Sequence, residues 1–195
     1  MIRNMTEDAI DRIVHEWNRV RPDLDVSVTH VLQRITRLYL LQSASFAEVF
    51  DRYGLTFGEY EVLAALVRSG PPHRLRPSDL VGALVLSSGA VTNRIDRVEA
   101  MGLVERLPDP DDRRGTLVAL TDKGRQVVDE AVVAHLAHEE RLLTAISTRE
   151  RRQLADLLRK LLVSEPFTGL DPTRSPDHDG RGTNHLARVQ RPRLR

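Results

Sequence analysis

The sequence predicts a mainly α-helical chain with one small β-hairpin, in the α+β class. Apolar residues recur at helical spacing over most of the 195 residues, and helix-capping signals stand at the starts of several of these stretches. One pair of short stretches, 103–107 and 115–120, has instead the apolar and β-branched character of strands on either side of a turn-rich segment. These observations indicate a helical protein that presents one hairpin.

Two helices are predicted in the N-terminal part of the chain. Thr6 is placed to cap a helix that runs to about Val20 with apolar residues at helical spacing. Ser27 is placed to cap a longer helix that runs to about Tyr53 and has a wide apolar face. Gly54 follows directly, and a left-handed glycine at this position commonly ends a helix.

The next two helices are predicted from the residues at their N-termini. Thr56 and Glu59 have the spacing of a capping box, in which two side chains satisfy backbone amides at the start of a helix. This helix stops near 69–72, which reads Ser-Gly-Pro-Pro. Pro77 suits the first turn of a short helix that runs to about Leu84.

A helix-turn-helix and a wing are expected in the middle of the chain. Ser87 or Ser88 begins a helix that ends near 101–102, only a few residues after the preceding helix. The two helices have apolar residues for a shared core: Leu80, Leu84, Val91, Ile95 and Val98. Because the strands 103–107 and 115–120 follow at once, the predicted unit is a winged helix-turn-helix.

Two further helices are predicted after the hairpin. Thr121 is placed to cap a long helix that runs to about Ala145. Ser147 and Glu150 form a second capping box and open a final helix that runs to about Val163. The flanking helices expose more apolar face than a lone chain of this length can cover, so a partner subunit is expected.

The helix after Ser87 has the chemistry of a DNA-recognition helix. Its first turns are rich in small and hydrogen-bonding side chains, which allow close approach to a major groove and contact with base edges. Two arginines at the hairpin tip suit a minor groove or phosphates. The predicted DNA-contacting residues are Ser87, Ser88, Ala90, Val91, Thr92, Asn93, Arg97, Arg113 and Arg114.

Charge does not by itself nominate DNA as the partner. The chain has 29 basic and 28 acidic residues, and residues 70–124 hold eight of each. A winged-helix protein-docking module without DNA binding therefore remains an alternative. Catalysis is not expected, because the chain has no phosphate loop, Gly-x-Ser-x-Gly elbow or His-Glu-x-x-His motif, and no cofactor is expected either.

No dedicated metal site is expected. His135 and His138 stand three residues apart on a predicted helix and could share a metal, but the chain has no cysteine and no clear third ligand. We expect them to be packed or solvated at a subunit interface, where burial would make a dimer pH-sensitive. No apolar run approaches the roughly 20 residues of a membrane helix, and the N-terminus lacks a signal-peptide pattern, so a cytoplasmic location is expected.

Several motifs, taken together and in order, resemble those of MarR-type transcriptional regulators. They lie within 54–80, 88–106, 108–115 and 120–124, and the resemblance runs from about residue 6 to 163. It implies a homodimer with intertwined terminal helices that binds a palindromic double-stranded DNA operator, with one recognition helix in each half-site. A repressor is the expected role.

A finer similarity is to the urate-responsive, PecS-like branch of that family. The extra N-terminal helix with Glu-Trp at 16–17, followed by 21–25 and 68–72, is similar to that branch. The resemblance implies a pocket for a small anionic ligand, urate first and a tricarboxylate or other anion as the alternative. The pocket residues that it implies are Trp17, Glu61, Arg94 and Arg106. Glu61 departs from the usual aspartate by one methylene. Two arginines suit a planar anion, and ligand contact with Arg94 would move the recognition helix and release DNA.

The predicted organisation has four parts. They are N-terminal helices for dimerisation and a ligand-pocket lid, the winged helix-turn-helix, C-terminal dimerisation helices and a disordered tail, over residues 1–56, 57–121, 122–165 and 166–195. The tail has six arginines and three aspartates and lacks periodicity. Two interpretations of it stay open, added nonspecific DNA affinity and an inert extension.

Overall fold

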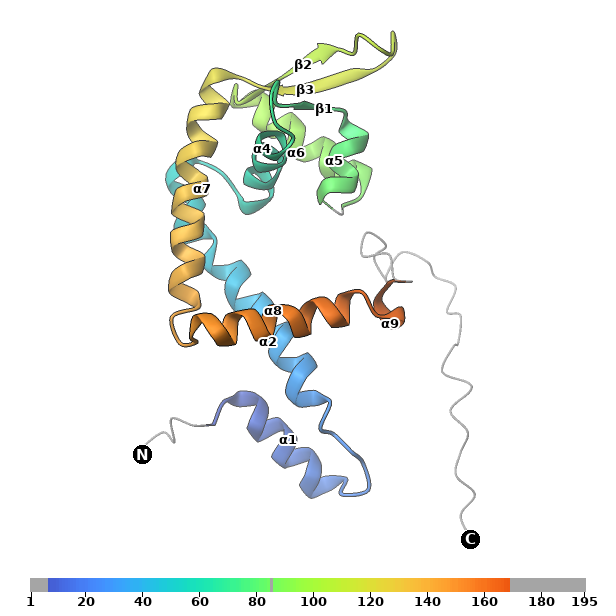
Figure 1. Cartoon of the computed structure of the whole chain (residues 1–195), viewed down its shortest axis with the longest axis vertical. Helices are drawn as coiled ribbons and strands as arrows, with labels where there is room; N and C mark the ends of the chain where they lie inside the picture. The colour runs from blue at the N-terminus through green and yellow to red at the C-terminus, as the bar shows by residue number, and fades with distance from the viewer. Residues whose placement is uncertain (1–6, 85, 169–195) are drawn as a thin grey trace.

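A computed structural model describes residues 7–84 and 86–168 of the chain. Helices dominate, and three short strands form one sheet (Figure 1). The elements in chain order are α1 Ala9–Val20, α2 Thr29–Ser45, α3 Ala47–Phe50, the 3-10 helix η1 Asp51–Tyr53, α4 Phe57–Arg68, β1 Arg74–Leu75, α5 Pro77–Leu84, α6 Ser88–Ala100, β2 Val104–Pro108, β3 Thr116–Leu120, α7 Asp122–Leu142, α8 Thr148–Leu162 and α9 Glu165–Thr168.

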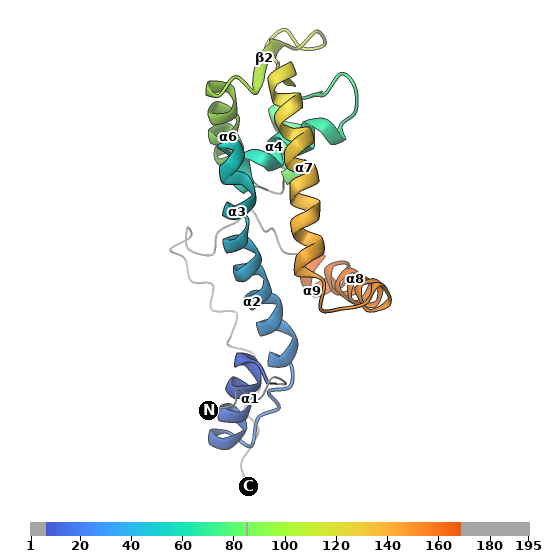
Figure 2. The ribbon, with the colours of Figure 1, turned by 90° about the vertical axis from the view of Figure 1, so that its left-hand side faces the viewer.

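The molecule is elongated, with a winged lobe at one end and α1 at the other. Helices α4, α5 and α6 and the sheet form the lobe, and α7 runs from the sheet along one side (Figures 1 and 2). Helix α2 extends from the lobe toward α1, while α8 turns away from the end of α7. The described helices include none that is long and apolar enough to cross a membrane.

One hydrophobic core lies inside the lobe. It joins buried apolar residues from α3 to α7 and from the strands β2 and β3. Phe50, Leu63 and Leu80 are among its fully buried side chains. Burial of each such side chain contributes about 1.5–3 kcal/mol, so the core fixes α5 and α6 relative to α4 and the sheet.

The sheet has a strand that the sequence did not indicate. Its order is β1-β3-β2, and both pairs are antiparallel. The hairpin strands start within one residue of their expected positions. Strand β1 has two residues, too few for an alternating pattern, and it forms because Arg74 and Leu75 pair with Ala119 and Val118 of β3.

Most predicted caps are confirmed by the hydrogen bonds that the caps make. Thr56, Ser87, Thr121 and Ser147 each accept a backbone N–H at the start of α4, α6, α7 and α8. Thr56 and Ser147 belong to complete capping boxes. Gly54 has a φ of 66° and ends η1 as expected.

Two predicted N-terminal caps are wrong or lie outside the description. Thr6 lies outside the described residues, and Asp8 caps α1 through a capping box with Asp11. Ser27 does not cap α2, since Val28 precedes that helix without a side-chain cap. Instead the backbone N–H of Ser27 donates to the carboxylate of Asp25, which forms a local turn.

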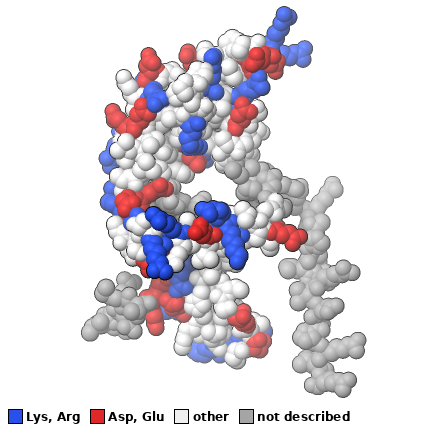
Figure 3. Space-filling view, in the orientation of Figure 1, with Lys and Arg blue, Asp and Glu red and all other residues white. Residues whose placement is uncertain are grey.

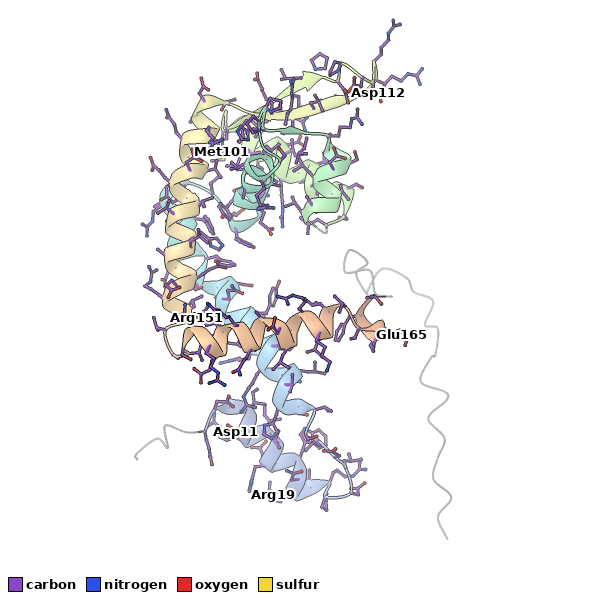
Figure 4. The ribbon with its side chains drawn as sticks, in the orientation of Figure 1. Asp11, Arg19, Met101, Asp112, Arg151 and Glu165 are labelled. Carbon is purple, nitrogen blue, oxygen red and sulfur yellow. The ribbon has the colours of Figure 1, made fainter. Side chains whose placement is uncertain are left out.

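The helix boundaries differ from the prediction at three further places. The long second helix is interrupted at Phe46, where α2 gives way to α3 and then η1. Helix α7 ends at Leu142 rather than near Ala145, and in the turn that follows Arg151 (labelled in Figure 4) donates to the carbonyls of Leu143 and Ile146. Helix α9 occupies the start of the predicted disordered tail, and residues 169–195 lie outside the described part.

The helices outside the lobe are poorly covered by the chain itself. None of the 17 residues of α2 is buried, and α8 has no buried residue either. Large apolar side chains are exposed along both helices: Val31, Leu32, Leu38, Tyr39, Leu154, Leu157 and Leu162. Such surfaces are too apolar to face water over two whole helices.

Candidate nucleic-acid interface

Helix α6 presents one polar face to solvent at the surface of the lobe. Val91, Ile95 and Val98 pack into the core and are at most 1% exposed. The opposite side of the helix carries exposed small, polar and charged residues: Ser88, Gly89, Thr92, Asn93, Asp96 and Arg97. The prediction that Val91 contacts DNA is therefore wrong, because its side chain is fully buried in the lobe.

The start of α6 is fixed by its own side chains. Ser87 Oγ accepts from the N–H of Ala90, and Thr92 Oγ1 donates to the carbonyl of Ser88 at 2.9 Å. Ser87 and Ser88 are both exposed, and Ala90 is partly so. The start of the helix is therefore accessible from solvent, a position that suits a phosphate oxygen.

The wing ends in a tight turn that holds two arginines outward. The N–H of Asp109 donates to the carbonyl of Gly115, and the N–H of Arg114 donates to the Asp112 carboxylate at 2.9 Å. Figure 4 places Asp112 at this tip, and Figure 3 shows basic side chains projecting from it. Arg113 and Arg114 are exposed there, as the sequence interpretation requires.

The tip turn of the wing, where it leaves β2, is joined to the start of α5 by an ion pair that sequence reasoning missed. Arg76 Nε lies 2.5 Å from Asp109 Oδ2, and the Asp109 side chain is 1% exposed. The hydrogen bond from Arg76 lowers the pKa of Asp109 below its usual range. An aspartate in the predicted turn and an arginine just before the predicted helix at Pro77 were the available signals, but only the fold shows that the two meet and that Asp109 is buried.

Arg106 contacts the recognition helix and not the expected ligand pocket. Its guanidinium pairs with Asp96 Oδ1 at 2.5 Å and also with Glu99, both on α6. Arg94 lies on another side of α6, since residues two apart are separated by about 200° around a helix. The structure therefore does not bring Arg106 together with Arg94.

Glu61 and Arg94 do meet. Arg94 Nη1 lies 3.0 Å from Glu61 Oε2 and also donates to the carbonyl of Gly58, so the arginine of α6 lies across α4. A Cβ at Gly58 would stand 2.6 Å from the Arg94 guanidinium carbon. The side chains of Arg94 and Glu61 are 27% and 32% exposed, so solvent reaches both.

Trp17 lies far from this ion pair in the single chain. It is 46% exposed on α1, at the opposite end of the molecule from the lobe (Figure 1). Helix α1 packs on α2 and is tied to it by Arg34, which pairs with Asp8 and Asp11. Of the four expected pocket residues, the chain thus brings together only Glu61 and Arg94.

The two histidines of α7 pack inside the chain. His135 is 9% exposed and lies among aromatic rings, with centroids 5.1 Å from Tyr60 and 5.4 Å from Phe46. His138 is 3% exposed, and its Nε2 lies 2.8 Å from Ser45 Oγ. These contacts join α7 to the start of the lobe.

Comparison with known proteins places this fold in one family of regulators. A MarR family model matches residues 53–115. The transcriptional regulator PecS of Dickeya dadantii is 36% identical over 149 residues, which cover 76% of this chain and 90% of that protein.

Solved structures of the same family match the fold as well. Sco5413, a MarR family regulator from Streptomyces coelicolor, has a TM-score of 0.63 and 32% identity, with 71% of this chain and 95% of that chain covered. A mutant MarR from Escherichia coli complexed with operator DNA has a TM-score of 0.61 and 27% identity, with coverage of 75% and 97%. The chain belongs to the MarR family of transcriptional regulators.

Proposed function

We propose that the chain is a repressor that binds a palindromic operator as a homodimer and releases it when a small anion binds. The solvent face of α6, flanked by the two arginines of the wing tip, is the observation on which the proposal depends. Asn93 and Arg97 supply groups for base edges or phosphates, and Arg113 and Arg114 suit a flanking minor groove. The related MarR in complex with operator DNA supports this use of the face.

The apolar surfaces outside the lobe support a homodimer. Leu38 on α2 and Leu157 on α8 are 63% and 62% exposed, and neighbouring apolar side chains extend both surfaces. A second copy offers the same surfaces in a self-complementary arrangement. We expect Leu157→Glu to shift the protein from dimer to monomer in sedimentation analysis, because a buried carboxylate without a partner is costly.

The ion pair of Glu61 and Arg94 supports the response to an anion. An anion that binds the Arg94 guanidinium takes the place of the Glu61 carboxylate, because both are acceptors for the same donors. Since Arg94 belongs to α6, this exchange changes how the recognition helix is held against α4, and so couples the ligand to DNA. Urate is the first ligand to test and citrate, a tricarboxylate, the second. 6-Hydroxynicotinic acid is the third, because it regulates DNA binding of the related BpsR of Bordetella bronchiseptica.

A gel shift on the DNA upstream of the chain's own coding region tests the proposal. We expect a specific shift that one of the three anions releases, and an Arg94→Gln variant that binds DNA but no longer responds. A specific shift that none of the three anions releases supports operator binding and excludes these anions as the ligand. Absence of any specific shift by a folded dimer, here and on operators selected from random duplexes, favours the protein-docking alternative.

A further inference from the structure

Two carboxylates lie on the recognition helix of a protein that approaches a polyanion. Asp96 lies on the solvent side of α6, with its side chain 55% exposed, and Glu99 is at the edge of the same face with 35% exposed. Arg97 is the neighbouring cation on this face, and its own guanidinium lies 3.5 Å from Glu59 of α4. Without a further cation, the approaching face would bring a net negative charge toward the phosphates.

Arg106 of β2 supplies that cation. Its two terminal nitrogens are divided between the two acids, one on Asp96 and one on Glu99, so one guanidinium is shared by two carboxylates one turn apart and, together with Arg97, balances their charge. The bond to Asp96 is the larger cause of a raised pKa at Arg106. Arg106 lies in β2, the first strand of the wing, where it pairs with Val118 of β3. Its contact with the two acids therefore also joins the wing to α6.

We propose that Arg106 is a positioning residue for DNA binding: it masks Asp96 and Glu99 from the phosphates and holds the wing strand on the recognition helix. This assignment rests on the proposed DNA-binding function. It differs from the pocket role that the family resemblance implies for Arg106, because the guanidinium is directed to the acids and not to Arg94. Arg106 acts on DNA through these two carboxylates, so its effect on DNA binding should depend on the presence of the acids.

The test is a charge-rescue series measured by gel shift on the upstream DNA at several salt concentrations. The variants are Arg106→Gln, Arg106→Lys, the pair D96N/E99Q, and the triple variant that joins this pair to Arg106→Gln. We expect Arg106→Gln to weaken binding by about fivefold at low salt, because it leaves one uncompensated negative charge in each protomer, and a charge roughly 8 Å from a phosphate repels it weakly in a high dielectric. Arg106→Lys should recover part of the loss, since a lysine keeps the charge but lacks the fork.

The triple variant decides the matter. If Arg106 acts through the acids, the triple variant regains affinity to within about twofold of the wild type at the same low salt, and its dependence on log salt keeps the wild-type slope. A triple variant as weak as Arg106→Gln, or a salt slope reduced in magnitude by about 1.8 (about 0.9 for each Arg106 of the dimer), would mean that Arg106 contacts a phosphate directly and would overturn the proposal. Wild-type affinity in Arg106→Gln would overturn it as well.

Two controls separate this result from other failures. Circular dichroism melting of each variant shows whether the fold survives, and Arg106→Lys provides the folded reference if Arg106→Gln is destabilised. If the wild type itself binds no specific DNA, the proposed function fails and this assignment fails with it. If the wild type binds specific DNA and all variants bind it with the same affinity, only the assignment of Arg106 fails.

Discussion

The contact between Gly124 of α7 and Leu103 yields a prediction whose sign is opposite to the usual rule for glycine in a helix. Gly124 is buried in the first turn of α7, where the helix crosses the end of the recognition unit. A Cβ at this position would lie 1.9 Å from the carbonyl oxygen of Leu103, whereas real Cβ contacts essentially never fall under 3.0 Å. The two backbones must therefore separate by about 1.1 Å, the difference of these distances.

Neither backbone of this contact can move without a cost in free energy. The Leu103 carbonyl also accepts the N–H of Thr121 at 3.1 Å, and Leu103 is itself 1% exposed. Overpacking of this kind costs about 1–3 kcal/mol, and weakening the hydrogen bond adds about 1 kcal/mol. Better helix propensity returns about 1 kcal/mol. We expect Gly124→Ala to lower the free energy of unfolding by about 2 kcal/mol.

Gly82 in α5 is the matched control. It also lies within a helix, but a Cβ there has no heavy atom within 4 Å. The same substitution should therefore raise stability by up to about 1 kcal/mol through helix propensity alone. The opposite signs at the two positions isolate the contact with Leu103.

Urea and thermal unfolding at one fixed protomer concentration measure the effect, since stability of an oligomer depends on concentration. For a chain of this size, 2 kcal/mol corresponds to a fall in Tm of roughly 4–8 °C. Gly124→Ala at or above the wild-type midpoint, with Gly82→Ala behaving as expected, would refute the close-packing argument for the α7 junction.

Three further predictions follow from the site. Gly58→Ala should displace the flexible Arg94 side chain from α4 with little change in Tm, and anion release of DNA measured by gel shift should change; an unchanged response would argue against the ion pair as the ligand site. Asp109→Asn should destabilise the wing, read out by amide hydrogen exchange. Arg76 lowers the pKa of Asp109 in the folded state, so the extra stability of the wild type over Asp109→Asn should be complete above pH 3.8, the ordinary pKa of an aspartate. This extra stability should disappear as the pH falls through the lower pKa of the folded state. An equal difference in stability at all pH values would contradict the argument. Thr56→Ala should cost about 1 kcal/mol in urea unfolding and Thr56→Ser much less, and equal losses would show that the capping hydroxyl is not the cause.

Local chemistry determined the element order almost completely. Capping side chains, Pro77 at the start of α5 and the left-handed Gly54 act within a few residues of themselves, so their effect is visible in the sequence. Hence the winged helix-turn-helix was predicted with helix starts that the hydrogen bonds confirm. The same locality let the sequence place Arg113 and Arg114 at an exposed turn.

The tertiary structure decided which side chains meet, because contacts across the fold depend on where whole elements pack. Strand β1 exists only through its pairing with β3, and the orientation of α6 decided between the two roles predicted for Val91, in favour of the core. Arg106 could not be assigned from sequence, since its partners lie on a helix whose rotation the core sets. The sequence by itself determined a winged helix-turn-helix architecture. The packing of α4, α6 and the wing determined that Arg94 meets Glu61 while Arg106 meets the two acids of α6.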